Sequence, residues 1–69
     1  MKQIDARGYA CPMPVIMVQK EVKASAPAEL QVLVDDKCAV ENVTRFGESQ
    51  GYDVTWQEVD DEFELTLKK

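Results

Sequence analysis

The chain lacks histidine and has only two cysteines, Cys11 and Cys38, among its 69 residues. A closed zinc site draws its ligands mostly from these two residue types, so one copy cannot assemble it, and we expect neither a metal ion nor another cofactor. No apolar run approaches the roughly 20 residues of a membrane-spanning helix, and the charged segment Met1 to Asp5 does not resemble a secretion signal. We therefore expect a cytoplasmic protein with no membrane segment and with reduced cysteines.

Basic residues are also scarce, because 8 Lys and Arg stand against 13 Asp and Glu and give a formal net charge of −5. Affinity for nucleic acid depends on Lys and Arg contacts to phosphates, so we expect no direct nucleic-acid binding. The acidity instead favours a protein partner with a basic docking face. The length and the 45% share of hydrophobic residues suffice for one small domain over residues 1–69, which we expect to be a monomer.

The first 27 residues predict a strand followed by a helix. Residues 2–5 form a short strand candidate, and Gly8 permits a positive φ in the connection. The helix is predicted to have Cys11 as its N-cap and Pro12 at its first position, where proline costs no hydrogen bond. It should end by residue 25 or 26, before Pro27. Helical spacing predicts an inward stripe of Val15, Val18 and Val22, with Ile16 on its flank.

A second strand and helix, then a hairpin, complete the pattern. Apolar residues alternate over residues 29–35, which is the period of a half-buried strand. The next helix has Asp36 as its N-cap, or alternatively starts at Cys38, and ends before Gly51. Two alternating segments follow, one around residues 54–56 and one over residues 63–67, joined by a turn at residues 60–61. The aromatic residues predicted to lie in the core are Phe46, Trp56 and Phe63.

This βαβαββ order predicts an α/β two-layer sandwich, with a four-stranded mixed sheet and both helices on one face. Right-handed crossovers make the first three strands parallel and the fourth antiparallel to them. The starts of both helices then lie at one edge of the sheet, where ligands usually bind in open α/β sheets. Cys11 and Cys38 both belong to this edge.

Cys11 is the strongest candidate for a reactive group. A cysteine at a helix N-terminus faces unpaired N–H groups and the positive end of the helix dipole, which favour its thiolate and lower its pKa from about 8.5. Pro12 and Pro14 have no N–H, so Met13 is predicted to be the only donor among the first three helical residues. The same pattern also fits a plain helix start with a small, buried Cys11.

Residues 5–16, Asp-Ala-Arg-Gly-Tyr-Ala-Cys-Pro-Met-Pro-Val-Ile, resemble the signature D-x-R/L-G-x-x-C-P-x-P-V of the TusA/SirA-like sulfur-carrier family. Weaker similarity extends along the chain, and the predicted βαβαββ order is that of the family. The resemblance implies that Cys11 accepts sulfur as a persulfide from a cysteine desulfurase-like donor and relays it to an acceptor protein, as a sulfurtransferase-type carrier. Met13, where the tRNA-thiolation branch has glutamate, and residues 39–43 look closer to the YedF-like branch, which is linked to selenium metabolism.

The residues beside Cys11 have supporting roles in this hypothesis, with Pro12, Met13 and Pro14 shaping the helix start. Arg7 either stabilises a thiolate or persulfide or pairs with Asp5 on the surface. Asp5 is expected to order the loop through backbone hydrogen bonds, and Gly8 is structural.

Met13 and Met17 are four residues apart and are predicted to share the outer face of the helix. Exposed methionines adapt to several partners, so we expect these two residues and Tyr9 to form a partner-docking surface. Two scattered surface residues are the simpler interpretation.

Three further functions fit the sequence. In a thiol redox or regulatory module, Cys38 would resolve the Cys11 persulfide or form a reversible disulfide with Cys11. The chain also fits a non-catalytic interaction domain or a selenium-metabolism accessory domain. For Cys38 itself, the simpler interpretation is that it fills space near the second helix start.

Overall fold

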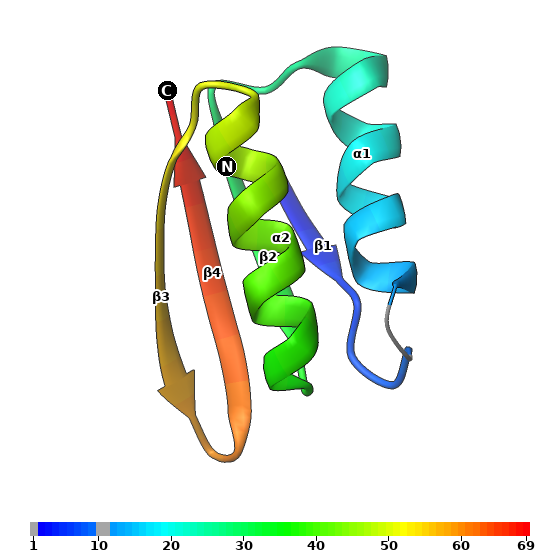
Figure 1. Cartoon of the computed structure of the whole chain (residues 1–69), viewed down its shortest axis with the longest axis vertical. Coiled ribbons are helices and arrows are strands. Elements are labelled where there is room, and N and C mark those ends of the chain that lie inside the picture. Colours follow the sequence, from blue (N-terminus) through cyan, green and yellow to red (C-terminus); the bar gives the residue numbers. More distant parts are fainter. Residues whose placement is uncertain (1, 10–11) are drawn as a thin grey trace.

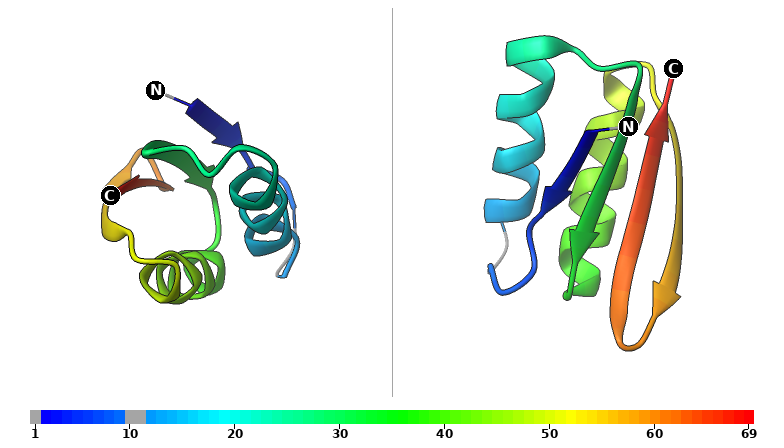
Figure 2. Two further views of the ribbon diagram at one scale, coloured as in Figure 1. Left: turned by 90° about the horizontal axis from the view of Figure 1, so that it is seen from above. Right: turned by 180° about the vertical axis from the view of Figure 1, so that it is seen from behind.

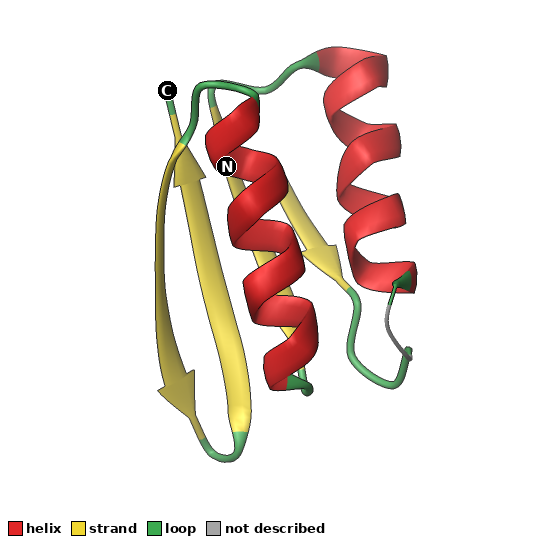
Figure 3. Ribbon diagram, in the orientation of Figure 1, coloured by secondary structure: helices red, strands yellow, loops and turns green. Residues whose placement is uncertain are grey.

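The computed structural model describes residues 2–9 and 12–69 and confirms the βαβαββ order (Figure 1). The strands are β1 (Lys2–Asp5), β2 (Glu29–Val34), β3 (Asp53–Val59) and β4 (Glu62–Lys68), and the helices are α1 (Met13–Ser25) and α2 (Lys37–Ser49). Both helices cover the same face of the sheet, as the views from above and behind show (Figure 2). The molecule is therefore the predicted two-layer sandwich (Figure 3).

The strands are arranged in the order β1-β2-β4-β3. β1 pairs parallel with β2, and β4 pairs antiparallel with both β2 and β3. β1, β2 and β3 consequently run in the same direction, as right-handed crossovers require. The C-terminal ends of these three strands and the starts of α1 and α2 all lie at one end of the sandwich, the lower end in Figure 1.

The core lies between the helices and the two central strands. Alternate residues of β2 and β4 are completely buried, as the half-buried strand pattern predicts, and the helices add apolar residues from the other layer. These buried residues are Val18, Val22, Leu30, Val32, Val34, Ala39, Val40, Val43, Leu65 and Leu67. The opposite face of the sheet is mostly polar, apart from Leu33 and Val59, and carries hydrogen bonds from Gln3 to Gln31 and from Gln31 to Glu64.

The ends of the elements follow local chemistry. Asp36 is the N-cap of α2, because its side chain accepts a hydrogen bond from the Cys38 N–H; the alternative start at Cys38 is wrong. α1 ends at the left-handed Ala26, with φ of 43°. The turn between β3 and β4 places Asp60 and Asp61 at φ of 51° and 64°. Two left-handed residues define a type I′ turn, whose twist matches that of the hairpin strands.

Tyr52 closes the end of the sandwich opposite the helix starts. Its side chain is buried, and its hydroxyl donates a 2.6 Å hydrogen bond to the Pro27 carbonyl. The Lys69 ammonium lies 4.9 Å from the Tyr52 ring centroid, and the Lys69 N–H donates to the Ala28 carbonyl. One aromatic residue thus joins the α1–β2 connection to the C-terminal end of the chain.

The predicted start of α1 and its inward stripe need correction. The helix begins at Met13, with Pro12 as N-cap and Pro14 at the second position, so Pro12 is not helical. Its buried stripe consists of Pro14, Val18 and Val22. Val15 is only half-buried, because it lies on the side of α1 that borders α2.

The placement of Trp56 in the core is wrong. Its side chain is 45% exposed, whereas Phe46 and Phe63 are partly buried and pack against the core, as predicted. β3 is an edge strand, so α2 covers it from one side only, and Trp56 makes an edge-to-face contact with Phe63 at 5.7 Å between ring centroids.

Gly47 allows α2 to approach the sheet closely. A Cβ atom there would lie 2.7 Å from Val54 Cγ2 and 2.8 Å from Leu67 Cδ2. We expect Gly47→Ala to destabilise the fold by about 1–2 kcal/mol, because overpacking costs about 1–3 kcal/mol and better helix propensity returns at most about 1 kcal/mol. Urea unfolding measures this change. The exposed Lys23→Ala is the control, and an equal effect of both variants would contradict the close packing.

Candidate functional site

The loop after β1 is organised by Asp5 and Arg7. Asp5 Oδ1 accepts hydrogen bonds from the Arg7 backbone N–H at 3.2 Å and from Arg7 Nε at 2.9 Å. Asp5 Oδ2 accepts a third from Arg7 Nη2 at 2.9 Å. Of the two roles predicted for Arg7, the structure shows pairing with Asp5 on the surface. Asp5 also has its predicted role, because it holds the loop backbone through an Asx-type hydrogen bond.

Two further contacts attach this loop to the rest of the fold. Arg7 Nη1 lies 3.1 Å from Glu62 Oε1 at the start of β4. The Gly8 N–H donates a 2.8 Å hydrogen bond to Asp35 Oδ2, directly after β2. Gly8 has φ of 83°, which confirms the positive φ expected there. The loop is therefore tied to both central strands.

Asp35 and Glu62 are the site residues that the sequence reasoning missed. Nothing in the sequence relates Glu62 to Arg7, which is 55 residues away. Asp35 follows the second strand, and parallel pairing of the first two strands puts its carboxylate beside the first loop. That topology was predictable, so the contact of Asp35 with this loop could have been found.

The start of α1 has few groups that offset its positive end. Its N-cap, Pro12, makes no side-chain capping hydrogen bond, and the first turn contains no acidic residue. Pro14 has no N–H, so Met13 and Val15 carry the N–H groups of the first turn. The prediction that Met13 is the only donor among the first three helical residues is therefore wrong. Cys11 itself lies outside the described residues.

The docking role of Tyr9, Met13 and Met17 stays a prediction, and the structure gives only the exposure of their side chains. Tyr9 and Met13 are 48% and 41% exposed, on either side of Cys11 in the sequence. Met17 is half-buried and packs against the core beside Ile4, so the expected pair of exposed methionines is wrong. α1 rotates its Pro14 stripe onto the sheet, and this rotation turns Met17 toward β1.

Cys38 lies at the second position of α2 and its side chain is exposed. Asn42 Nδ2 is 3.8 Å from Cys38 Sγ. Asn42 also borders a groove between the two helices, lined by Pro12, Val15, Gln19, Asn42, Arg45, Phe46 and Ser49. The residue that follows Cys11 and the residue that contacts Cys38 thus border the same groove.

Acid should weaken the Asp5–Arg7 pair. The hydrogen bonds from Arg7 lower the pKa of the Asp5 carboxyl to about 2. This value lies below the unfolded value of about 3.9, so the carboxylate stabilises the fold above pH ~4 and that contribution is lost as the pH falls through about 2.

The measurement is the difference in Tm between the wild-type chain and Asp5→Asn as a function of pH. We expect a constant difference at neutral pH that shrinks between about pH 4 and pH 2. Asp53→Asn, at the opposite end of the sheet, is the control, and a pH-independent difference for Asp5→Asn would contradict the pairing.

No helix in the described part of the chain is long and apolar enough to cross a membrane. Residues 2–69 match the protein family described as "Sulfurtransferase TusA". The chain is 38% identical to "Putative sulfur carrier protein MJ0990" of Methanocaldococcus jannaschii, with 100% of this chain and 95% of that protein covered. It is 35% identical to "Putative sulfur carrier protein YrkI" of Bacillus subtilis, over 81% of this chain and 76% of that protein.

The fold is likewise similar to a solved structure. The crystal structure of a SirA-like protein from Desulfitobacterium hafniense superimposes with a TM-score of 0.87 at 34% identity, and covers 97% of this chain and 95% of that one. A family match over residues 2–69, two sulfur-carrier relatives above 30% identity and a shared βαβαββ fold agree. The chain belongs to the TusA/SirA-like sulfurtransferase family of sulfur carriers.

Proposed function

We propose that the chain carries sulfur as a persulfide on Cys11, which it receives from a cysteine desulfurase-like donor and passes to an acceptor protein. The observation behind this proposal is the Cys-Pro-Met-Pro segment, residues 11–14, at the start of α1 in a chain of the sulfur-carrier family. The donors of the first turn and the absence of acidic residues there favour an anionic sulfur nearby.

Loading transfers one sulfur atom from the donor persulfide to the Cys11 thiolate. The Cys11 thiolate attacks the terminal sulfur of the donor persulfide, a new sulfur–sulfur bond forms, and the donor cysteine leaves as a thiolate. A thiolate of the acceptor protein then attacks the terminal sulfur of the Cys11 persulfide and takes it, and Cys11 leaves as a thiolate. No oxidant or metal ion is consumed, because the sulfur keeps its oxidation state throughout.

Partner proteins must dock beside Cys11, which stands between Tyr9 and Met13 in the sequence. Tyr9 and Met13 provide exposed apolar surface there, and the net charge of −5 favours partners with a basic docking face. The Asp5–Arg7 pair, Gly8 and Asp35 hold the loop, so we assign them positioning roles. Met13, in place of glutamate, supports the YedF-like branch and a link to selenium metabolism.

Intact mass spectrometry tests the carrier function directly. After incubation with a cysteine desulfurase and cysteine, the wild-type chain should gain the mass of one sulfur atom, which a thiol reductant removes. Cys11→Ser should gain none, because it lacks the accepting thiolate, while Cys38→Ser should be loaded normally. Equal loading of Cys11→Ser would reject the assignment.

A thiol redox function involving Cys38 is the second candidate, and the groove shared by Pro12 and Asn42 favours it. In this reaction the Cys38 thiolate attacks the inner sulfur of the Cys11 persulfide, a Cys11–Cys38 disulfide forms, and hydrosulfide leaves. The two thiols lose two electrons and the transferred sulfur gains them, so the step needs no other reactant.

The persulfide lifetime distinguishes the two functions. If Cys38 resolves the persulfide, the loaded wild-type chain should lose one sulfur and two hydrogens and release sulfide, whereas loaded Cys38→Ser should persist. Equal lifetimes in both chains would rule out the redox function and leave the carrier function intact.

A further inference from the structure

The outer edge of β3 has backbone groups that no strand of the described chain satisfies. β4 is the strand that pairs with β3. The 60–61 turn closes on Val59 and Glu62, and in such a turn the first residue's carbonyl accepts from the fourth residue's N–H. Val59 therefore points its backbone groups toward β4. These groups alternate along a strand, so those of Val54, Trp56 and Glu58 point away from the sheet.

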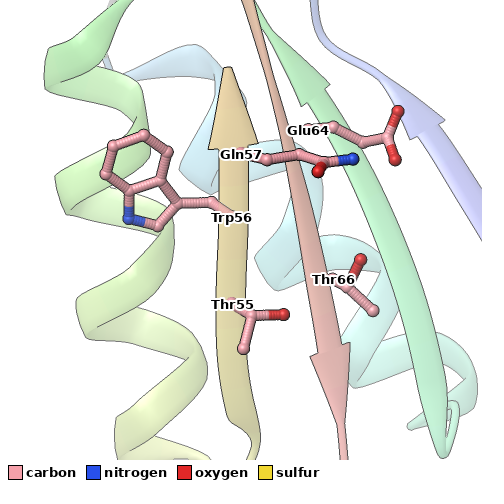
Figure 4. Close-up of a pocket in the computed structure, with 5 residues that line it drawn as sticks. All are labelled: Thr55, Trp56, Gln57, Glu64 and Thr66. Atoms are coloured by element: carbon pink, nitrogen blue, oxygen red, sulfur yellow. The ribbon is translucent and has the colours of Figure 1, made fainter. Parts of the chain in front are cut away.

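This edge lacks several of the features that usually prevent pairing with another chain, although it carries two acidic residues, Asp53 and Glu58. Exposed edges are commonly short or carry lysine, proline or a bulge, whereas β3 has seven residues and neither lysine nor proline. Trp56 and Val59 are 45% and 44% exposed. Figure 4 shows Trp56 directed toward α2, whereas Thr55 and Gln57 lie on the opposite, polar face. The edge thus offers both hydrogen-bonding groups and apolar surface.

α2 presents alternating charges beside this edge. Lys37, Glu41, Arg45 and Glu48 line, together with Trp56, a shallow cavity of about 310 Å³. From the start of the helix to its end, the signs are plus, minus, plus, minus. A second copy of α2 running in the opposite direction would place a negative charge against each positive one. We call these four residues the α2 charge stripe.

We propose that β3 pairs antiparallel with β3 of a second copy of this chain, about a two-fold axis at Trp56, to form a continuous eight-stranded sheet. In this register Trp56 faces Trp56, Val54 faces Glu58 and Asp53 faces Val59. No acidic residue of β3 faces another acidic residue, and like charges directly opposite would destabilise the pair. The outward groups of Val54, Trp56 and Glu58 pair with those of the second copy.

The same two-fold axis matches the α2 charge stripe. Trp56 lines one cavity with all four stripe residues, so the axis lies level with the middle of the stripe. Lys37 then faces Glu48 of the second copy, and Glu41 faces Arg45. α2 contacts both β3 and β4, and strands lie about 4.8 Å apart, so the two helices would be about 10–14 Å apart. Long charged side chains span that gap.

Self-complementarity favours a second copy of this chain over a strand of another protein as the partner of β3. Both the β3 register and the α2 charge stripe are self-complementary, as a two-fold interface requires. The two net charges of −5 repel each other, but this repulsion is largely screened beyond about 8 Å at physiological salt. The pairing also leaves the helix starts open, because antiparallel β3 strands place the two sites at opposite ends of the sheet. The proposed pairing therefore replaces the monomer expected from the sequence with a weak dimer.

Sedimentation equilibrium at physiological salt tests the proposal. The wild-type chain should shift from monomer to dimer mass as its concentration rises toward about 1 mM, a range typical of weak association. The acidic variant Lys37→Glu/Arg45→Glu and the basic variant Glu41→Lys/Glu48→Lys should each self-associate at least about tenfold more weakly, because like charges then face each other. Mixing these two variants should restore a dimer.

Control variants separate the interface from net charge and from folding. Lys20→Glu/Lys23→Glu changes the net charge as the acidic variant does, but on α1, and should dimerise nearly as the wild-type chain does. Glu58→Pro removes the outward N–H of residue 58, a group that makes no hydrogen bond to β4, and should abolish dimerisation. Glu58→Ala keeps this N–H and should not abolish dimerisation. Circular dichroism verifies that each variant folds. A wild-type chain that stays monomeric, or mixed variants that do not associate, would overturn the proposal.

Discussion

Burial of a single face of the sheet is the constraint on which the rest of this small structure depends. β2 and β4 are the central strands, and most of their inward residues are completely buried, while their outward residues are polar except for Leu33. Both helices must therefore cover the same face. Two crossovers of the same hand then bring both helix starts to one end of the sandwich. The position of the candidate site is thus a consequence of how the core is buried, and does not depend on any contact between its own residues.

The loop before α1 needs additional support because it has little apolar surface to bury. Asp5, Arg7, Gly8, Asp35 and Glu62 supply that support with charges and backbone hydrogen bonds. Exposed ion pairs contribute little to global stability, but several of them acting on one short loop restrict its conformations. A carrier that must present one sulfur atom to different partners benefits from such a loop, since less conformational entropy is then lost on each encounter.

Periodicity and turn chemistry predicted nearly all of the fold. The alternation of residues 29–35, the cap at Asp36 and the turn at residues 60–61 are local signals, and the structure confirms each of them. The rotation of α1 could not be predicted in this way, because Val15 and Pro14 are both apolar and only packing against α2 decides which of them is buried. The exposure of Trp56 depends on the strand order β1-β2-β4-β3. Local pattern does not determine that order.

The two ends of the sandwich are held by different kinds of interaction. At one end, the buried Tyr52 ring and its hydrogen bond to the Pro27 carbonyl hold the structure without an ion pair or a carboxylate. At the other, exposed carboxylates hold the loop through Arg7 and Gly8. Local opening of a native protein starts where such exposed contacts dominate. Amide hydrogen exchange in the loop should therefore be faster than around Tyr52 and should respond to ionic strength, so that a charged partner could change the order of the loop without disturbing the core.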